Sequence, residues 1–400
     1  MKVPQTHPAV TLVAVAMLAF AAGAAASELT DRGIQPALVD DGAGFADFAG
    51  GLRRGSTFLG TLRLQLTADG MRLVGVPGMT FYIEEMNVHG GHPSRYAGDA
   101  QGVSNLEGPA RWMLYEGWIQ QNLFENQLSI LIGRYDLNSE FYRLQSAGLF
   151  LNSSFGIGPE FSQSGRAGPS IFPDTSVGAR IAWKPAPGVV LRTAILDGPL
   201  LVAESAYLFR PNSDSPRNSR LRIGRRSGLP PYTAKVAVGT WHSMATYPDL
   251  LETTADGQPI RHKGSSGAYA LADIPIYKDA SSPERRVTLF GQFGVGDARL
   301  NHFARYTGAG IVMSAPFEGR ETDEVGVAIA MAYNGGHYAA QQSAAGTRVT
   351  NAEVTIEGGY LAPLTPHVAI QPDVQYVLHP DTDRARKNAL VVMLRFEMSF

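Results

Sequence analysis

Glu116 and Trp118 lie two residues apart in an alternating stretch, Arg111 to Asn122. Side chains at such positions face the same side of an extended strand. The carboxylate would then offer hydrogen-bond acceptors beside a flat aromatic surface. Other alternating stretches carry charged donors at similar positions: Arg63, Arg180 and Arg192. These residue types suit non-covalent recognition of a polar molecule, because charged side chains make the stronger hydrogen bonds.

Covalent, metal and cofactor chemistry have little support in the sequence. The chain has no cysteine, and His89 and His92 lack nearby carboxylate partners at metal-binding spacing. Gly291–Gly296 reads GQFGVG but belongs to an alternating strand with no helix after it, so a dinucleotide site is not expected. Lys and Arg number 34 against 36 Asp and Glu, without a long basic run, which argues against a nucleic-acid partner. We expect no cofactor and no enzymatic activity.

The elements that position these residues are best seen at Ala389–Phe400, where every second residue is apolar. The opposite face contains Arg395 and Glu397 as well as apolar residues. Lipid on one side and water on the other would explain both faces, as in a transmembrane β-barrel. The alternative is an edge strand of a soluble sandwich, but this alternation is longer than the usual strand of about 5 to 6 residues. A terminal aromatic residue also resembles the sorting signal of bacterial outer-membrane proteins.

Counting back from this strand gives sixteen strands, an even number that places both ends of the barrel sequence on one side. The sequence therefore predicts an all-β fold, a 16-stranded antiparallel transmembrane β-barrel. Pro185–Gly188 is the clearest short turn, and Ser243–Ser266 is expected to be an outer loop. Pro211–Pro231 is too long for a simple turn and has no physical explanation. The predicted strands are 33–45, 57–68, 79–87, 111–122, 128–135, 175–184, 189–196, 201–209, 232–242, 267–277, 285–296, 307–317, 324–333, 351–361, 367–378 and 389–400.

The N-terminus predicts export. Val10–Ala22 is continuously apolar, and Ala24 and Ala26 form a small-x-small cleavage site. We expect residues 1–26 to be a signal peptide and residues 27–400 to form the barrel in the outer membrane. No other segment approaches the roughly 20 apolar residues that a spanning helix needs.

One long connection, about residues 136–174, is expected to fold into the barrel as a constriction loop. Loops of this length are uncommon unless functional, and a sixteen-stranded barrel is wide enough to enclose an aqueous channel. The loop carries apolar side chains that need a surface to pack against, and the inner barrel wall offers one: Phe141, Tyr142, Leu149, Phe150, Leu151, Phe155, Ile157 and Phe161.

Several motifs resemble the OprB family of carbohydrate-selective porins. They include GRYDLNSEF at Gly133–Phe141, SAGLFLNSSFGIGPEFSQSG at Ser146–Gly165 and GPSIFPDTSVGARIAWKP at Gly168–Pro185. Further matching stretches are Gly50–Asp69, Asn87–Gly91 and Leu114–Gln121. The resemblance implies sixteen-stranded outer-membrane channels, usually homotrimeric, that pass monosaccharides and related polyols.

Sugars are neutral, so a channel would select them by width, hydroxyl hydrogen bonds and aromatic stacking. Alternation places Trp112, Leu114, Glu116 and Trp118 inside and Met113 and Tyr115 outside. Our hypothesis is that arginines face Glu116 at the constriction; the alternative is a solvated wall whose charges pair for stability. A second alternative for the whole protein is a general, non-selective porin. The candidate constriction residues are Glu116, Trp118, Arg180, Arg192, Arg63, Glu85, Arg95, Asp136 and Glu140.

Overall fold

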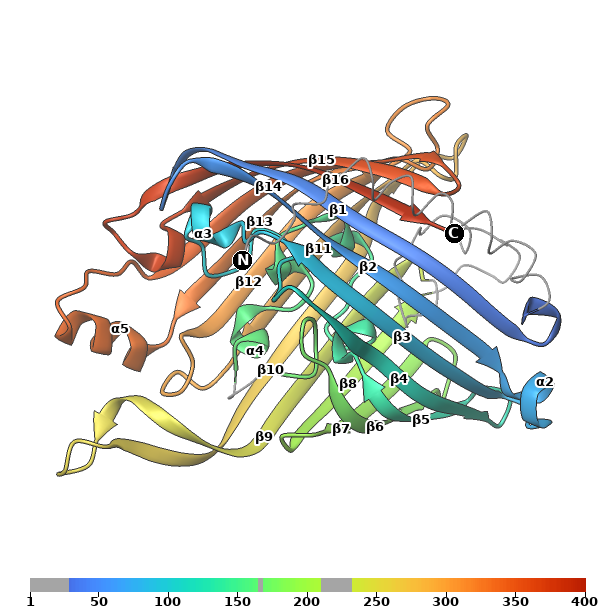
Figure 1. Cartoon of the computed structure of the whole chain (residues 1–400), viewed down its shortest axis with the longest axis horizontal. Helices are drawn as coiled ribbons and strands as arrows, with labels where there is room; N and C mark the ends of the chain where they lie inside the picture. The colour runs from blue at the N-terminus through green and yellow to red at the C-terminus, as the bar shows by residue number, and fades with distance from the viewer. Residues whose placement is uncertain (1–28, 165–167, 210–231) are drawn as a thin grey trace, which may run out of the picture.

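A computed structural model describes residues 29–164, 168–209 and 232–400, which form a closed antiparallel barrel (Figure 1). Each strand pairs with its neighbours in sequence, and β1 (Ile34–Gly51) closes the barrel against β16 (Lys387–Ser399). Closure satisfies every strand edge, as a spanning sheet requires. The predicted sixteen strands and their antiparallel order are confirmed by these ranges. The others are β2 (Gly55–Asp69), β3 (Met79–Gly90), β4 (Arg111–Leu123), β5 (Leu128–Tyr135), β6 (Ser176–Trp183), β7 (Val189–Leu196), β8 (Leu200–Phe209), β9 (Ala234–Thr253), β10 (Pro259–Lys278), β11 (Arg286–Val295), β12 (Phe303–Ser314), β13 (Glu324–Asn334), β14 (Ala352–Thr365) and β15 (Val368–Leu378).

Helices occur only in connections and are short within the described ranges. None of those helices is long and apolar enough to cross a membrane. They are α2 (Gly70–Val74), α3 (Ser94–Ala97), η1 (Leu137–Ser139), η2 (Ser146–Leu149), η3 (Ser153–Phe155), α4 (Pro159–Ser162), α5 (Gly336–Ala344) and η4 (Pro380–Thr382).

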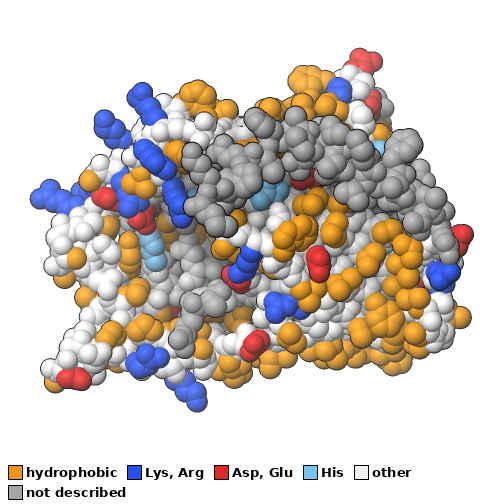
Figure 2. Space-filling model, in the orientation of Figure 1, with side chains coloured by type: hydrophobic (Ala, Val, Ile, Leu, Met, Phe, Trp, Pro, Cys, Tyr) orange, Lys and Arg blue, Asp and Glu red, His pale blue; other side chains and the backbone are white. Residues whose placement is uncertain are grey.

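The two predicted faces of the last strand are confirmed. Leu394 is 55% exposed, whereas its neighbours Met393 and Arg395 are 1% and 6% exposed. The same alternation recurs around the barrel, and Figure 2 shows hydrophobic side chains over much of its outer face. The apolar face therefore points outward, and the charged face points into the barrel, as expected for strands between lipid and water.

The barrel has two different ends. The turn end carries α2, Phe400 and short connections such as the one between β6 and β7, where Gly188 takes the expected positive φ of 78°. The loop end carries α3, α5 and the hairpin of β9 and β10, which projects from the barrel in Figure 1. Residues 1–26 and the whole of the unexplained segment Pro211–Pro231 lie outside the described residues.

The prediction that Ser243–Ser266 forms a loop is wrong, because most of this segment belongs to β9 and β10. β9 and β10 remain paired almost to their tip, from Asp273 opposite Lys235 to Pro259 opposite Thr253. The polar composition of this region is typical of a loop, but the hairpin gains partners from other segments. Asp249 of β9 accepts hydrogen bonds from His262 of the same hairpin at 2.9 Å and from His337 of α5 at 2.7 Å. The contact with α5, 88 residues away along the chain, cannot be read from local composition.

Candidate functional site

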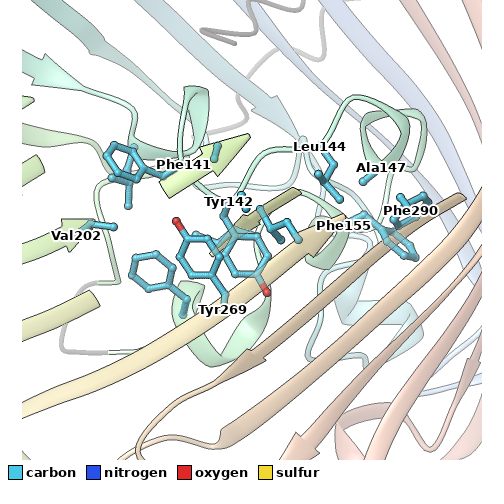
Figure 3. Packing of buried hydrophobic residues seen from close by; sticks show 14 of the residues in the cluster. Phe141, Tyr142, Leu144, Ala147, Phe155, Val202, Tyr269 and Phe290 are labelled. Atoms are coloured by element: carbon cyan, nitrogen blue, oxygen red, sulfur yellow. The ribbon is translucent and has the colours of Figure 1, made fainter. Parts of the chain in front are cut away.

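The described part of the β5–β6 connection, residues 136–164 and 168–175, folds into the barrel and is called the inner loop here. Most of its apolar side chains pack against the inner faces of β5 and β7–β13 (Figure 3), whereas Leu151 packs with residues of β1, β2, β15 and β16. The ring centroids of Phe150 and Phe155 are 5.0 Å apart, and Phe161 stacks on Trp241 of β9 at 5.1 Å. The predicted packing of the loop against the wall is confirmed, because all eight of its expected apolar residues are buried.

Buried carboxylates on the strands hold the backbone of the inner loop. Asp273 of β10 accepts hydrogen bonds from the backbone N–H groups of Gln145 (3.1 Å) and Ser146 (3.2 Å), and from the Ser146 hydroxyl (2.7 Å). Glu357 of β14 accepts from the N–H groups of Leu151 and, at 3.1 Å, Asn152. We call Asp273, Glu357 and Glu204 the anchor carboxylates. They replace the water that would otherwise solvate these amides.

Glu204 of β8 is the most connected anchor. It accepts hydrogen bonds from the N–H of Tyr142 and the hydroxyl of Tyr269, both at 3.0 Å. The same carboxylate faces the ammonium of Lys235 at 3.2 Å and the guanidinium of Arg192 at 3.5 Å. Arg192 therefore points inward, as its parity predicted, but its charge is used within the wall.

The carboxylate of Glu160 in α4, toward the end of the inner loop, lies in a recess lined by Gly158 and Gly294. A Cβ atom at Gly294 would come within 1.8 Å of its carboxylate oxygen, and one at Gly158 within 2.2 Å. The hydroxyl of Tyr142 donates to Glu160 at 2.9 Å. Burial raises the pKa of Glu160 to about 7. The glycine-rich stretch at Gly291–Gly296 is thus a strand whose small residues admit this carboxyl group.

The start of the inner loop forms a second polar group with β5 and β6. The Arg180 guanidinium pairs with Glu140 at 2.7 Å and also donates to the Gln120 side chain at 2.7 Å. The hydroxyl of Tyr135 donates to Glu140 at 2.7 Å. Asp136 caps η1 by accepting from the N–H of Asn138 at 2.8 Å, and burial raises its pKa to about 6. Arg180, Glu140 and Asp136 therefore all lie where the loop leaves the wall.

Glu116 and Trp118 of β4 face the interior of the barrel. The indole N–H of Trp118 donates to Glu116 at 3.1 Å, and the N–H of Asp136 donates to the same carboxylate at 3.2 Å. Trp118 is partly exposed, and its ring centroid lies 5.0 Å from that of Tyr82. Glu116 thus links the aromatic pair to the start of the inner loop.

A β-bulge overturns part of the predicted alternation in β4. Glu84 pairs with Glu116, but Glu85 pairs with Leu114, which leaves Tyr115 as an extra residue. Tyr115 consequently turns inward, is 6% exposed and donates to Asp136 at 2.8 Å. The predictions that Trp112 and Leu114 face inward are wrong, because they are 56% and 47% exposed on the outer face.

The inner faces of β16 and β1–β4 carry a group that we call the polar arc: Asp41, Arg63, Gln65, Glu84, Glu116, Trp118 and Arg395. Asp41 binds two guanidinium groups, with Arg63 at 2.5 Å and Arg395 at 2.7 Å. Arg395 also donates at 3.1 Å to Asn105, which belongs to the β3–β4 connection. Gln65 donates to Glu84 at 2.9 Å. The side chain of Arg63 remains 16% exposed, so the polar arc presents a charged donor as well as an indole to the interior.

Three parts of the predicted constriction are not assembled as expected. The arginines do not converge on Glu116: Arg180 pairs with Glu140, Arg192 with Glu204 and Arg63 with Asp41. Glu85 is exposed on the outer face beside Leu114, and Glu84 takes the inward position instead, because strand parity turns neighbouring residues to opposite sides. Arg95 is exposed on α3, which contacts β1 and β16 rather than β4.

The sequence interpretation missed most of the carboxylates that hold the interior together. The three anchor carboxylates alternate with outward apolar residues such as Leu201, Ile274 and Ile356, so the parity rule applied to β4 could have placed them inside. Their partners could not have been found in this way, since Glu357 and Leu151 are 206 residues apart. Among the described residues, no group of three or more His, Asp or Glu could hold a metal ion.

Comparisons with known proteins agree with this geometry. Residues 53–400 match the family model described as carbohydrate-selective porin, OprB family. Porin B of Pseudomonas aeruginosa is 22% identical, over 76% of this chain and 72% of that protein. A high-pH structure of Pseudomonas putida OprB superposes with a TM-score of 0.80 at 19% identity, covering 94% of this chain and 96% of the other. A low-pH structure of the same protein superposes at 0.59 with 15% identity, over 94% and 95% of the two chains.

Proposed function

The chain belongs to the OprB family of carbohydrate-selective porins, and from this premise we propose that it passes monosaccharides and related polyols by passive diffusion. The observation that carries the proposal is that Trp118 of β4 and Arg63 of β2, both on the polar arc, keep partly exposed side chains. Together they offer an aromatic face for the C–H face of a sugar ring and a strong donor for its hydroxyls. Passive diffusion of this kind needs no cofactor and breaks no covalent bond.

The inner loop narrows the passage toward the polar arc. Most of its apolar side chains are packed on β5 and β7–β13. On the other side Leu151 packs with apolar residues of β1, β2, β15 and β16, and the polar arc supplies the charged and aromatic groups of that side. Arg180, Arg192, Glu140 and Asp136 position the loop and the wall, because they are paired with protein groups. Trp118 and Arg63 also have protein partners, but their side chains stay partly exposed, so we assign the solute contacts to these two residues.

The cellular setting completes the proposal. Residues 1–26 direct export, residues 27–400 form the barrel in the outer membrane of a Gram-negative cell, and the protein assembles as a homotrimer. The apolar outer face supports a lipid environment, and the family resemblance supports the trimer. Native mass spectrometry of the detergent-extracted protein tests the assembly, since a single-chain mass would contradict it.

Liposome swelling tests the proposed selectivity. Swelling rates of liposomes that contain the refolded barrel are compared for three solutes: glucose, a disaccharide and an amino acid close to glucose in size. We expect glucose to enter faster than the amino acid, and Trp118→Ala to reduce that difference. Equal rates for all small solutes would instead identify a general, non-selective porin, and no swelling would contradict an open channel.

A further inference from the structure

A cavity of about 750 Å³ lies at the loop end, between α5 and the ends of β12 and β13. One wall is formed by one side of α5, and another by residues 346–351, which lead into β14. Arg305, Arg348 and Arg384 line it from three separate segments. None of the described residues that line this cavity is acidic. The cavity therefore concentrates positive charge.

The floor of the cavity belongs to the outer face of the barrel. Arg305 of β12 lies directly opposite Tyr333 of β13. The same register continues toward the turn end with Ile311 opposite Val327, which are 42% and 55% exposed. Since alternate residues share a face, Arg305 and Tyr333 lie on the same side as this apolar surface. The cavity thus sits above the lipid-facing wall and outside the passage described above.

The cationic groups have room for an external anion. No carboxylate among the described residues forms an ion pair with these three arginines, although Arg384 donates to the backbone oxygen of Val349 at 3.2 Å. Figure 2 shows Lys and Arg side chains gathered toward this end of the molecule, away from the hydrophobic outer surface. Guanidinium groups bind phosphate in fork-like geometry through two parallel hydrogen bonds. Three of them around one cavity fit a phosphorylated group.

We propose that this cavity binds the phosphorylated headgroup of a lipid in the outer leaflet. The acyl chains of this lipid lie along the apolar strip, the outer surface of β12 and β13 that contains Ile311 and Val327. Arg305, Arg348 and Arg384 bind the phosphate oxygens, and Ile311 and Val327 contact the chains. Continuity between the basic cavity and the apolar strip favours a lipid over a free anion. A border of this kind between membrane and water is also where Tyr side chains are usual.

A neutral sugar fits this cavity less well. The Arg305 guanidinium lies over the ring of Tyr333, with its central carbon 4.1 Å from the ring centroid. That ring face is already covered by a cation and is not open for stacking on a sugar. The ligand class indicated by the cavity is therefore anionic.

Binding of lipid A to the full barrel in detergent tests the proposal by native mass spectrometry. The probes are lipid A with two phosphates, the same lipid after both phosphates are removed, and inorganic phosphate as competitor. Arg348→Gln and Arg384→Gln each remove one donor, and their expected effect is about tenfold weaker binding of the phosphorylated lipid. Arg95→Gln is the matched control, because Arg95 is exposed at the same end but does not line the cavity.

The outcomes separate the possible sources of binding. Tight binding of only the phosphorylated lipid, weakened in both cavity variants and unchanged in the control, supports the site. Equal binding of the dephosphorylated lipid would overturn it, as would equal loss in Arg95→Gln. Displacement by inorganic phosphate at a similar concentration would show a free-anion site instead of a lipid site. Arg348 lies in a connection, so its variant should fold; unchanged lipid binding in that variant, with normal glucose swelling, would also overturn the proposal.

Discussion

Replacing Asp273 with asparagine should loosen the inner loop while leaving the barrel closed. Asp273 accepts hydrogen bonds from two loop N–H groups, from the Ser146 hydroxyl and, at 2.8 Å, from the hydroxyl of Tyr232. Hydrogen bonds to a charged group contribute about 1.5 to 3 kcal/mol each. Asparagine keeps one acceptor oxygen but loses the charge. We therefore expect the free energy that holds the inner loop against the wall to fall by about 3 kcal/mol, which raises the population of the displaced loop about a hundredfold.

Liposome swelling with a disaccharide and a monosaccharide measures this change, because a displaced loop widens the passage. We expect the ratio of disaccharide to monosaccharide rates to rise in Asp273→Asn. Asp323→Asn is the matched control, since Asp323 is also fully buried but binds Arg320 and Tyr360 near the turn end. If both variants lower thermal stability equally and neither changes the rate ratio, Asp273 supports the barrel alone and the reasoning is refuted.

Three further predictions concern the interior. Trp118→Ala should lower the glucose preference several-fold with little change in ion conductance, whereas Trp118→Phe should keep most of it; equal effects of both would contradict a stacking role. Arg180→Ala should destabilise the protein by about 3 to 5 kcal/mol, because it leaves Glu140 buried without its partner, and adding Glu140→Gln should restore most of the loss in thermal unfolding. The pKa of Glu160 is raised from 4.5 to about 7. Its contribution to the free energy of unfolding should therefore be largest below pH 4.5 and fall by about 3 kcal/mol as the pH rises to 7. Glu160→Gln should remove that part of the pH dependence of thermal unfolding, and an unchanged pH profile would show that another group is responsible.

Strand order and side-chain direction were predictable because a period of two is enforced by lipid on one side and water on the other. Arg63, Arg180 and Arg192 illustrate this, since each one faces inward as its outward apolar neighbours indicated. The rule failed at Tyr115, where a single bulge shifts the remainder of β4 by one position. A bulge depends on the register of the neighbouring strand, and that register is not written in the local pattern.

The pairing of charges could not be predicted from the sequence. Parity places Glu116 and Arg180 on the same side of the wall, but it does not say which carboxylate each guanidinium meets. Arg180 meets Glu140 because the inner loop carries that carboxylate back to β6. The candidate site thus depends on how the loop folds, which is decided by buried contacts far apart in sequence. The role of Trp118 and Arg63 at the constriction stays a prediction.

Sugar-dependent block of ion current through single channels in planar bilayers tests the central claim most directly. A sugar bound at the polar arc occupies the passage and excludes ions. We therefore predict that glucose lowers the conductance of the wild-type channel in a saturable way, and that Trp118→Ala weakens this block. Conductance that follows only the viscosity of the glucose solution, identically in both proteins, would contradict a sugar-selective constriction at this site.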